Sequence, residues 1–227
     1  MAKNDLRTEA IVLRRTKYGE TDRILNLITP QGRLSVIAKG ARKEKSKLAG
    51  GIEMFCVSEI TAHFKSDSSD ALGILTSARL QGFYSGIMSD LDRLELASRM
   101  LKNVAKLSDQ IDSPELYTLT KSCLAALHQN QNQKLTEAWF LLNLSRISGE
   151  QINLHFDTNG QKLQNELKYS WNELEKSFSP HERGDIESNH IKLLRLMVTA
   201  DLPTILRIKD ADALIDSVLY IAKSCYN

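Results

Sequence analysis

The sequence predicts a two-domain α+β protein, in which a five-stranded barrel of the OB type precedes an all-α helical domain. Three observations support this fold class. Short alternating segments broken by turns fill the first eighty residues, a helical period begins near residue 85, and the charge changes sign between the two parts. Residues 1–85 contain fourteen Lys and Arg against nine Asp and Glu, whereas the remainder contains sixteen against nineteen. We therefore expect domains at residues 1–82 and 83–227.

The first part is expected to form five strands. Alternating apolar and polar residues with turn signals between them predict strands at residues 8–16, 22–29, 33–39, 52–65 and 72–79. Pro30-Gln31-Gly32 places Pro and Gly where a tight turn favours them, and residues 66–70 read as a polar hairpin tip. Closure into a barrel suits such short strands, because it removes the exposed edges of a flat sheet.

Beyond residue 85, apolar residues recur at helical spacing. Helices are expected at about residues 87–107, 116–127, 133–147, 187–200 and 211–222. Ser113-Pro114 and Ser179-Pro180-His181-Glu182 are interpreted as helix start signals. Trp139 and Phe140 lie in a helix that is apolar nearly all round, which favours core packing over base stacking. Residues 166–177 fit a strand as well as a helix.

The composition resembles that of ordinary globular proteins. The 227 residues carry a formal net charge of +2, and 42% of them are hydrophobic. The longest apolar run, residues 138–142, is far shorter than the roughly twenty residues of a membrane span. The N-terminus shows no apolar segment of a secretory signal. We therefore expect a cytoplasmic protein without membrane contact.

Common catalytic signatures are absent from the sequence. GxSxG, HExxH, GxGxxG and CxxC do not occur, and residues 40–46 lack the second Gly of a P-loop. The five histidines are scattered and are interpreted as solvated or capping residues. Cys56, Cys123 and Cys225 are an odd set in a cytoplasmic chain, so we expect buried thiols rather than disulfides. The sequence thus favours a protein that is not an enzyme and uses no cofactor or metal.

A dense run of cations is the feature that points to a function. Six Lys and Arg lie within residues 33–47, with only Glu44 against them. They are Arg33, Lys39, Arg42, Lys43, Lys45 and Lys47, and the first two strands add Arg14, Arg15, Lys17 and Arg23. Residues 40–51 read as a long loop with almost no apolar residue to anchor it. A run of one sign in an OB barrel predicts a nucleic-acid site, whereas an ordinary solvated face is the alternative.

The same part of the chain contains aromatic side chains on which bases could stack. They are Tyr18, Phe55, Phe64, Phe83 and Tyr84. The sequence does not determine which of them point outward.

Several segments together resemble the N-terminal domain of the RecO family of bacterial DNA repair proteins. The segments are Thr8–Leu13 (TEAIVL), Tyr18–Leu25 (YGETDRIL), Gly32–Arg42 (GRLSVIAKGAR), Lys45–Gly50 (KSKLAG) and residues 91–97. The resemblance is close over the first hundred residues. Beyond them it holds in the helical pattern and in the order of segments.

The resemblance implies a recombination mediator associated with the nucleoid. Such a protein binds single- and double-stranded DNA, anneals complementary strands and is not an enzyme. It is expected to work with a RecR-like partner, and to help load a RecA-like recombinase onto strands coated by single-strand-binding protein. In some members the helical domain docks the C-terminal tail of single-strand-binding protein. The cations that would contact an acidic tail here are Arg195, Arg207 and Lys209.

Many members of that family also carry a four-cysteine zinc site at the position of residues 152–177. This segment contains no cysteine, and Asn, Gln and Lys cannot replace thiolate ligands, so no metal is expected. The insert at about residues 150–178 has two possible forms. It is reduced to a short hairpin, or it packs its apolar residues Phe156, Leu163, Leu167, Tyr169 and Trp171.

Two alternative functions remain open on the sequence. The barrel of a protein-interaction scaffold would contact an acidic protein instead of DNA. An RNA-binding OB module would have the same charge pattern without annealing activity.

Overall fold

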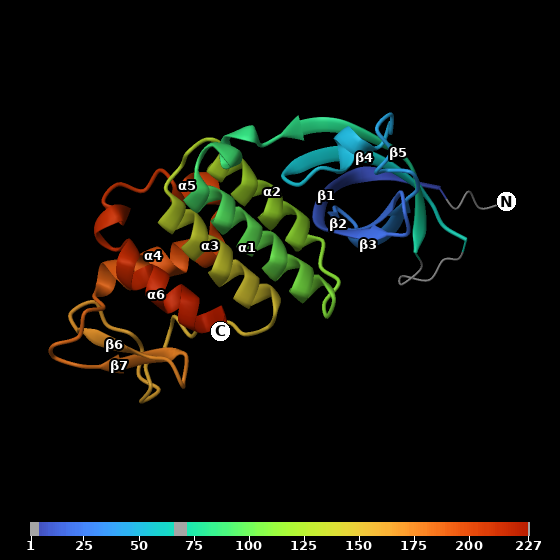
Figure 1. Ribbon diagram of the computed structural model, residues 1–227. Coiled ribbons are helices and arrows are strands. Elements are labelled where there is room, and N and C mark those ends of the chain that lie inside the picture. The colour runs from blue at the N-terminus through green and yellow to red at the C-terminus, as the bar shows by residue number, and fades with distance from the viewer. Residues whose placement is uncertain (1–4, 66–71, 227) are drawn as a thin grey trace. The chain divides into compact units, whose positions relative to one another are not determined.

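The structure is a computed structural model that describes residues 5–65 and 72–226 (Figure 1). Contacts within the chain group it into two compact units, residues 1–129 and 130–227. The hairpin tip expected at residues 66–70 lies outside the described residues. The domain boundary expected after residue 82 stays a prediction.

Five strands of the first unit close into a barrel in the order β1-β2-β3-β5-β4 (Figure 1). All neighbours pair antiparallel except β3 and β5, which run parallel and pair at Val36 and Ile37. The strands are β1 (Asp5–Tyr18), β2 (Asp22–Thr29), β3 (Gly32–Ala38), β4 (Cys56–His63) and β5 (Gly73–Phe83). The predicted fold class, a five-stranded barrel followed by a helical region, is confirmed.

Because side chains alternate along each strand, every second residue points into the barrel and fills it. Ala10 and Val12 of β1 belong to the inner core, together with Leu25, Leu27 and Val36 from the next two strands. A bulge between Val12 and Arg14 shifts the register of β1 against β2. Ile11, Leu13 and Ile28 are also buried but lie outside this inner cluster. They face the side on which two helices contact β1, β2 and β3.

These two helices are α1 (Leu91–Ser108) and α2 (Glu115–His128). The side chain of Glu9 on β1 links α2 to the barrel, because its carboxylate accepts hydrogen bonds from the Tyr117 hydroxyl at 2.5 Å and the Lys121 ammonium at 2.9 Å. The two bonds lower the pKa of Glu9. Burial and the adjacent Glu9 raise the pKa of Tyr117. The barrel and α2 therefore share one polar anchor as well as an apolar contact.

The second unit is mainly helical. Trp139 and Phe140 are buried in α3, which confirms their predicted place in the core. Its helices are α3 (Gln133–Ile147), α4 (Ser188–Thr199), α5 (Leu202–Ile205) and α6 (Ile215–Tyr226), and its strands are β6 (Tyr169–Asn172) and β7 (Ser177–Pro180). Short 3-10 turns occur in the first unit at Ala49–Ile52 (η1) and Ser85–Ser89 (η2), and in the second unit at Ala211–Ala213 (η3).

The helix start expected at Ser179-Pro180 is wrong. Both residues belong to β7, where Ser179 pairs with Ser170 and Pro180 with Tyr169. The helix begins later, at Ser188, where Glu187 and His190 form a reciprocal capping box. A Ser-Pro pair fits the end of a short strand as well as a helix start, because Pro lacks only the N–H that an edge position does not need.

All three cysteines are buried thiols, as predicted. Burial raises the pKa of Cys123, and it raises the pKa of Cys225 to about 11. Within residues 5–65 and 72–226, no helix is both long and apolar enough to cross a bilayer.

Candidate nucleic-acid interface

The strand register brings most of the predicted cations to one end of the barrel. Lys17 on β1 lies opposite Arg23 on β2, and Arg23 lies opposite Ala38, which is part of the inner core. Directly opposed residues share a face of the sheet, so Lys17 and Arg23 stand on the inner face at this end of the barrel. Arg14 lies opposite Asn26 on the outer face of the same end.

Residues 40–51 fold against this end as a chain of turns. The backbone N–H of Arg42 donates to Thr21 O at 2.8 Å, and the Gly40 N–H donates to the Asp22 carboxylate at 2.7 Å. Gly40 adopts a φ of +63°, which glycine accepts without a steric penalty. Within the loop, Ala41 is buried in the barrel core and Leu48 packs against that core. The expectation that almost no apolar residue anchors this loop is therefore wrong.

Asp22 is an acidic residue within the cationic surface that sequence reasoning did not single out. Its pKa is lowered, first by the hydrogen bond from Gly40 and also by the charges of Lys39 and Lys43. A carboxylate at the start of β2 thus holds the loop that follows β3. No motif marks this role, since Asp22 and Gly40 are eighteen residues apart.

The arginines and lysines of the loop differ in their partners. The Arg42 guanidinium donates to the backbone carbonyls of Gly19 at 3.4 Å and Glu20 at 3.0 Å, which ties the loop to the β1–β2 turn. Lys43, Lys45 and Lys47 are exposed, and no side chain within the described parts of the chain pairs with them. Their ammonium groups are available to an external anion.

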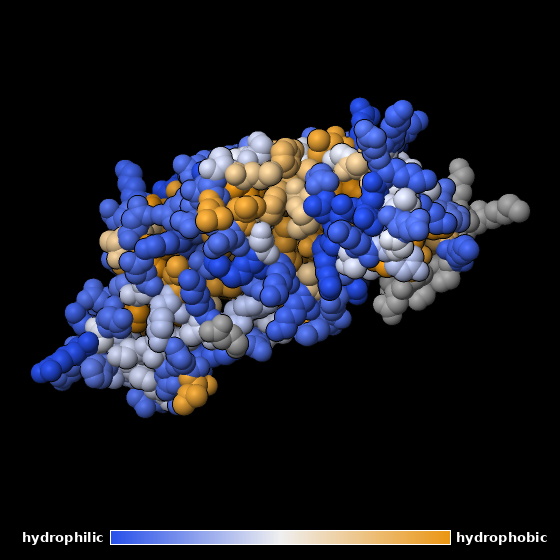
Figure 2. Space-filling model, in the orientation of Figure 1, coloured by the Kyte–Doolittle hydropathy of each residue, from blue (hydrophilic) through white to orange (hydrophobic). Residues whose placement is uncertain are grey.

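We call this surface the cationic end. In Figure 2, hydrophilic residues cover most of the visible barrel. Its members are Arg14, Lys17, Arg23, Lys39, Arg42, Lys43, Lys45 and Lys47. Arg15 lies next to it but is engaged, because it forms an ion pair with Glu53 at 2.6 Å.

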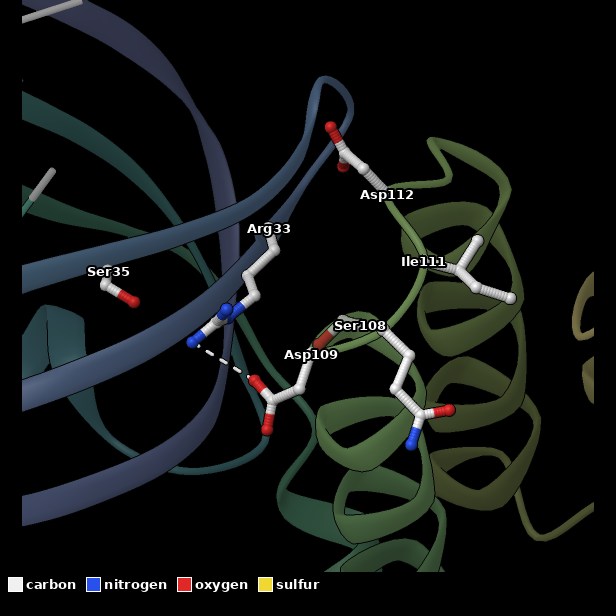
Figure 3. Close-up of a pocket in the computed structure, with 7 residues that line it drawn as sticks. Arg33, Ser35, Ser108, Asp109, Ile111 and Asp112 are labelled. Carbon is white, nitrogen blue, oxygen red and sulfur yellow. Dashed lines mark ion pairs between the residues drawn. The ribbon is translucent and has the colours of Figure 1, made fainter. Parts of the chain in front are cut away.

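Arg33 lies apart from the cationic end. It is at the start of β3, and the length of that strand separates it from Lys39 by about 20 Å. Its guanidinium pairs with Asp109 at 3.1 Å, beside a pocket of ≈ 320 Å³ between β3 and the α1–α2 connection (Figure 3). Asp112 also lines this pocket. Two carboxylates beside one arginine do not favour a polyanion there.

Comparison with known proteins agrees with this architecture. The family model Recombination protein O N terminal matches residues 1–84, and Recombination protein O C terminal matches residues 88–227. This chain belongs to the RecO family. A function in DNA repair and recombination follows from that membership.

Curated RecO relatives match much of the chain. A DNA repair protein RecO of Dehalococcoides mccartyi is 31% identical over 222 residues, covering 91% of this chain and 83% of the relative. The proteins of the same name from Roseiflexus and Geobacter metallireducens are 31% and 33% identical over 150 residues each. Those two matches cover 66% and 65% of this chain, and 52% and 60% of the relatives.

The insert of this RecO chain is held by side-chain packing and by a turn. Phe178 is fully buried between Tyr169 and Trp171, with ring centroids at 6.3 and 5.3 Å. The hairpin β6–β7 and an aromatic cluster therefore occur together, although the sequence suggested them as alternatives. Phe156 and Leu167 are about two-fifths exposed, so the expectation that they pack in the insert is wrong.

The donors of the insert do not fit a zinc site of the four-cysteine kind. The Asp157 carboxylate, the one buried acidic group of the turn at residues 157–161, accepts the backbone N–H of Asn159 at 2.8 Å and of Gln161 at 2.9 Å. No group of three His, Cys, Asp or Glu that could hold a metal occurs in the part of the chain that the structure describes.

Among the three cations expected to contact a partner, one is bonded within the chain and two are exposed. The Arg195 guanidinium donates through Nε and NH2 to the Leu154 carbonyl, at 3.0 and 2.8 Å, and so fixes the insert to α4. Arg207 and Lys209, after α5, are exposed. Of the three, these two remain open to an external carboxylate.

Proposed function

We propose that this RecO chain binds single- and double-stranded DNA at the cationic end and anneals complementary strands there. The observation that carries the proposal is the cross-strand pair of Lys17 and Arg23. Like charges directly opposite each other destabilise a sheet, and phosphate oxygens between them would remove that repulsion. Counterion release from the strand adds affinity with little sequence preference.

Annealing follows from the same charges. Two strands repel each other through their phosphates, and cations placed on both strands lower that repulsion. Lys43, Lys45 and Lys47 project from a loop that is itself fixed by Asp22 and Arg42. The long lysine side chains thus project from a loop whose backbone is held in place. Their charges can follow the phosphates of two DNA strands while the strands pair.

The test is binding of a bare oligonucleotide in a gel-shift assay without any protein partner. The triple variant Lys43→Ala, Lys45→Ala and Lys47→Ala is expected to lose binding to both single and double strands. A control with equal charge loss replaces the exposed helical lysines Lys102, Lys106 and Lys192 and should bind almost normally. Equal binding by both triple variants would contradict the assignment of the cationic end.

The same assay separates the two alternative functions. A scaffold for an acidic protein would show no binding to the bare oligonucleotide. An RNA-binding module would prefer an RNA strand in competition with the matched DNA strand, whereas contacts to phosphates alone predict little difference.

We also propose that the second unit contacts the acidic C-terminal tail of single-strand-binding protein through Arg207 and Lys209. Their exposure supports this role, whereas the bond of Arg195 to Leu154 supports a structural one. Replacement of Arg207 and Lys209 by Ala should weaken binding of a synthetic tail peptide and leave DNA binding unchanged. Unchanged peptide binding would remove both residues from the proposed contact.

The mediator role requires a RecR-like partner and a RecA-like recombinase. Its test is annealing of complementary strands precoated with single-strand-binding protein, with and without this chain. We expect annealing only in its presence, and faster recombinase loading when the RecR-like partner is added. Normal binding to bare DNA without annealing of coated strands would contradict the mediator role and leave only DNA binding.

A further inference from the structure

The outer face of β1, β2 and β3 at the cationic end carries an exposed aromatic ring. Tyr18, at the end of β1, lies opposite Asp22 and is 53% exposed. Of the other aromatic candidates in the first unit, Phe55 is buried, Phe64 packs against the barrel core, and Phe83 is 43% exposed but lies at the end of β5, opposite Cys56. Tyr84 lies against His128, with ring centroids 5.9 Å apart. Tyr18 is the exposed aromatic residue on the strands that carry the cations.

An apolar strip continues the surface of Tyr18 across the sheet. Ile24, two residues beyond Asp22 on β2, lies opposite Ile37 on β3, and Ile37 lies beside Ile74 on β5. Neighbouring Leu25 and Val36 point into the barrel, so by alternation the isoleucines point outward. They are only half-buried. An aromatic ring beside half-buried aliphatic side chains is a surface that fits a flat, apolar ring face.

Cations flank this strip on two sides. Arg14 shares the outer face of β1 with Tyr18 by alternation. Lys39 comes two residues after Ile37, one step beyond the pair of Arg23 and Ala38. Two strand spacings separate Lys39 from Tyr18, about 10 Å. A nucleobase on Tyr18 would therefore have its own phosphates within reach of long basic side chains.

We propose that Tyr18 is a stacking platform for an unpaired nucleobase, with Ile24 and Ile37 beside it, and that it makes the cationic end prefer single strands. This inference rests on the proposed DNA binding at that end. Every base has an aromatic face, so stacking is tolerant of sequence. In a duplex those faces are covered by neighbouring bases, and only the cations can bind. Base pairing during annealing would then remove the bases from Tyr18 and weaken the hold on the product.

The experiment compares Tyr18→Leu and Tyr18→Phe with the unchanged chain. The probes are a labelled single-stranded oligo-dT and a duplex of equal length, measured by fluorescence anisotropy at fixed salt. Loss of one stacked base weakens binding by about 5- to 150-fold. We expect that loss for Tyr18→Leu on the single strand and little change on the duplex, with an unchanged salt dependence. Tyr18→Phe keeps the ring and should bind as the unchanged chain does.

Tyr220 of α6, an exposed tyrosine at 58% in the second unit, supplies the matched control. Tyr220→Leu should bind both probes normally. Equal loss on single strand and duplex, or no loss for Tyr18→Leu, would overturn the stacking role. If the lysine triple variant loses binding while Tyr18→Leu does not, the stacking role fails and the proposed function stands. If neither variant loses binding, the proposed function itself fails.

Discussion

Lys17 and Arg23 form a like-charge pair directly across β1 and β2. Their mutual repulsion lowers the stability of the free protein. Such local conflicts are expected at functional surfaces, where the ligand supplies the missing counter-charge. Removing one of the two charges is therefore expected to raise the stability of the protein and to lower its affinity for DNA.

Replacing Lys17 by Gln should reveal this trade-off. Removing one of the two charges relieves the repulsion, so the free energy of unfolding should rise by up to about 0.5 kcal/mol. Affinity for DNA should fall at the same time. Urea unfolding and oligonucleotide binding measure the two effects, and Lys17→Arg should leave both unchanged. A variant that loses stability and affinity together would contradict the account.

Glu9 makes a second prediction at this scale, which concerns pH. The hydrogen bonds from Tyr117 and Lys121 lower its pKa in the folded protein. Its contribution to stability is therefore complete above the ordinary glutamate pKa of about 4.3, and is lost as the pH falls through the lowered value. Because the group is partly exposed to solvent, we expect Glu9→Gln to cost about 1 kcal/mol at neutral pH.

Urea unfolding between neutral and acidic pH checks this. The difference between the unchanged chain and Glu9→Gln should shrink toward acid. Asp216, which pairs with Lys134 at 2.6 Å on the surface, provides the control through Asp216→Asn, since exposed ion pairs contribute little. A difference that stays constant with pH would show that the carboxylate charge is not what the contact depends on.

The β6–β7 hairpin is the element whose packing centres on one aromatic side chain. Phe178 is fully buried, with Tyr169 and Trp171 around it. Replacing it with Ala should cost about 3–5 kcal/mol and expose the hairpin to hydrogen exchange. Phe156→Ala is the control, because that ring is 42% exposed and should cost much less.

A chelator provides the second arm of this prediction. Because the donors of the insert do not fit a zinc site, EDTA should leave the melting temperature of the unchanged chain where it was. A structural zinc contributes folding energy directly, so a clear drop in melting temperature with EDTA would contradict the account of the insert.

How far the sequence predicts these elements depends on the kind of signal. The strands of the barrel follow from alternation and from turn residues such as Pro30 and Gly32, and these signals are local. Arg33 and Lys39 read as one cluster because they are close in sequence, yet β3 carries them to opposite ends. Closeness in sequence is also no guide to the contact between Asp22 and Gly40, because the pairing of β2 with β3 brings these two residues together.

At the scale of the whole molecule, the low net charge of +2 conceals a basic barrel followed by a more acidic remainder. The first unit orders its cations through Asp22, Arg42 and the strand register, and directs Arg33 toward Asp109 instead. The second unit uses Arg195 to hold its insert and keeps Arg207 and Lys209 exposed. Family membership gives the process, DNA repair and recombination, and the charge arrangement supports the proposed contact with DNA.

The dependence of oligonucleotide affinity on salt tests that contact most directly. If about five phosphates are bound, log K should fall against log salt with a slope of roughly −3.5 for a single strand. Each lysine removed from Lys43, Lys45 and Lys47 should reduce the slope by about 0.7, so the triple variant should approach −1.4. The control triple variant at Lys102, Lys106 and Lys192 should keep the original slope. An equal slope for both triple variants and the unchanged chain would contradict the central claim that the cationic end of the barrel binds DNA.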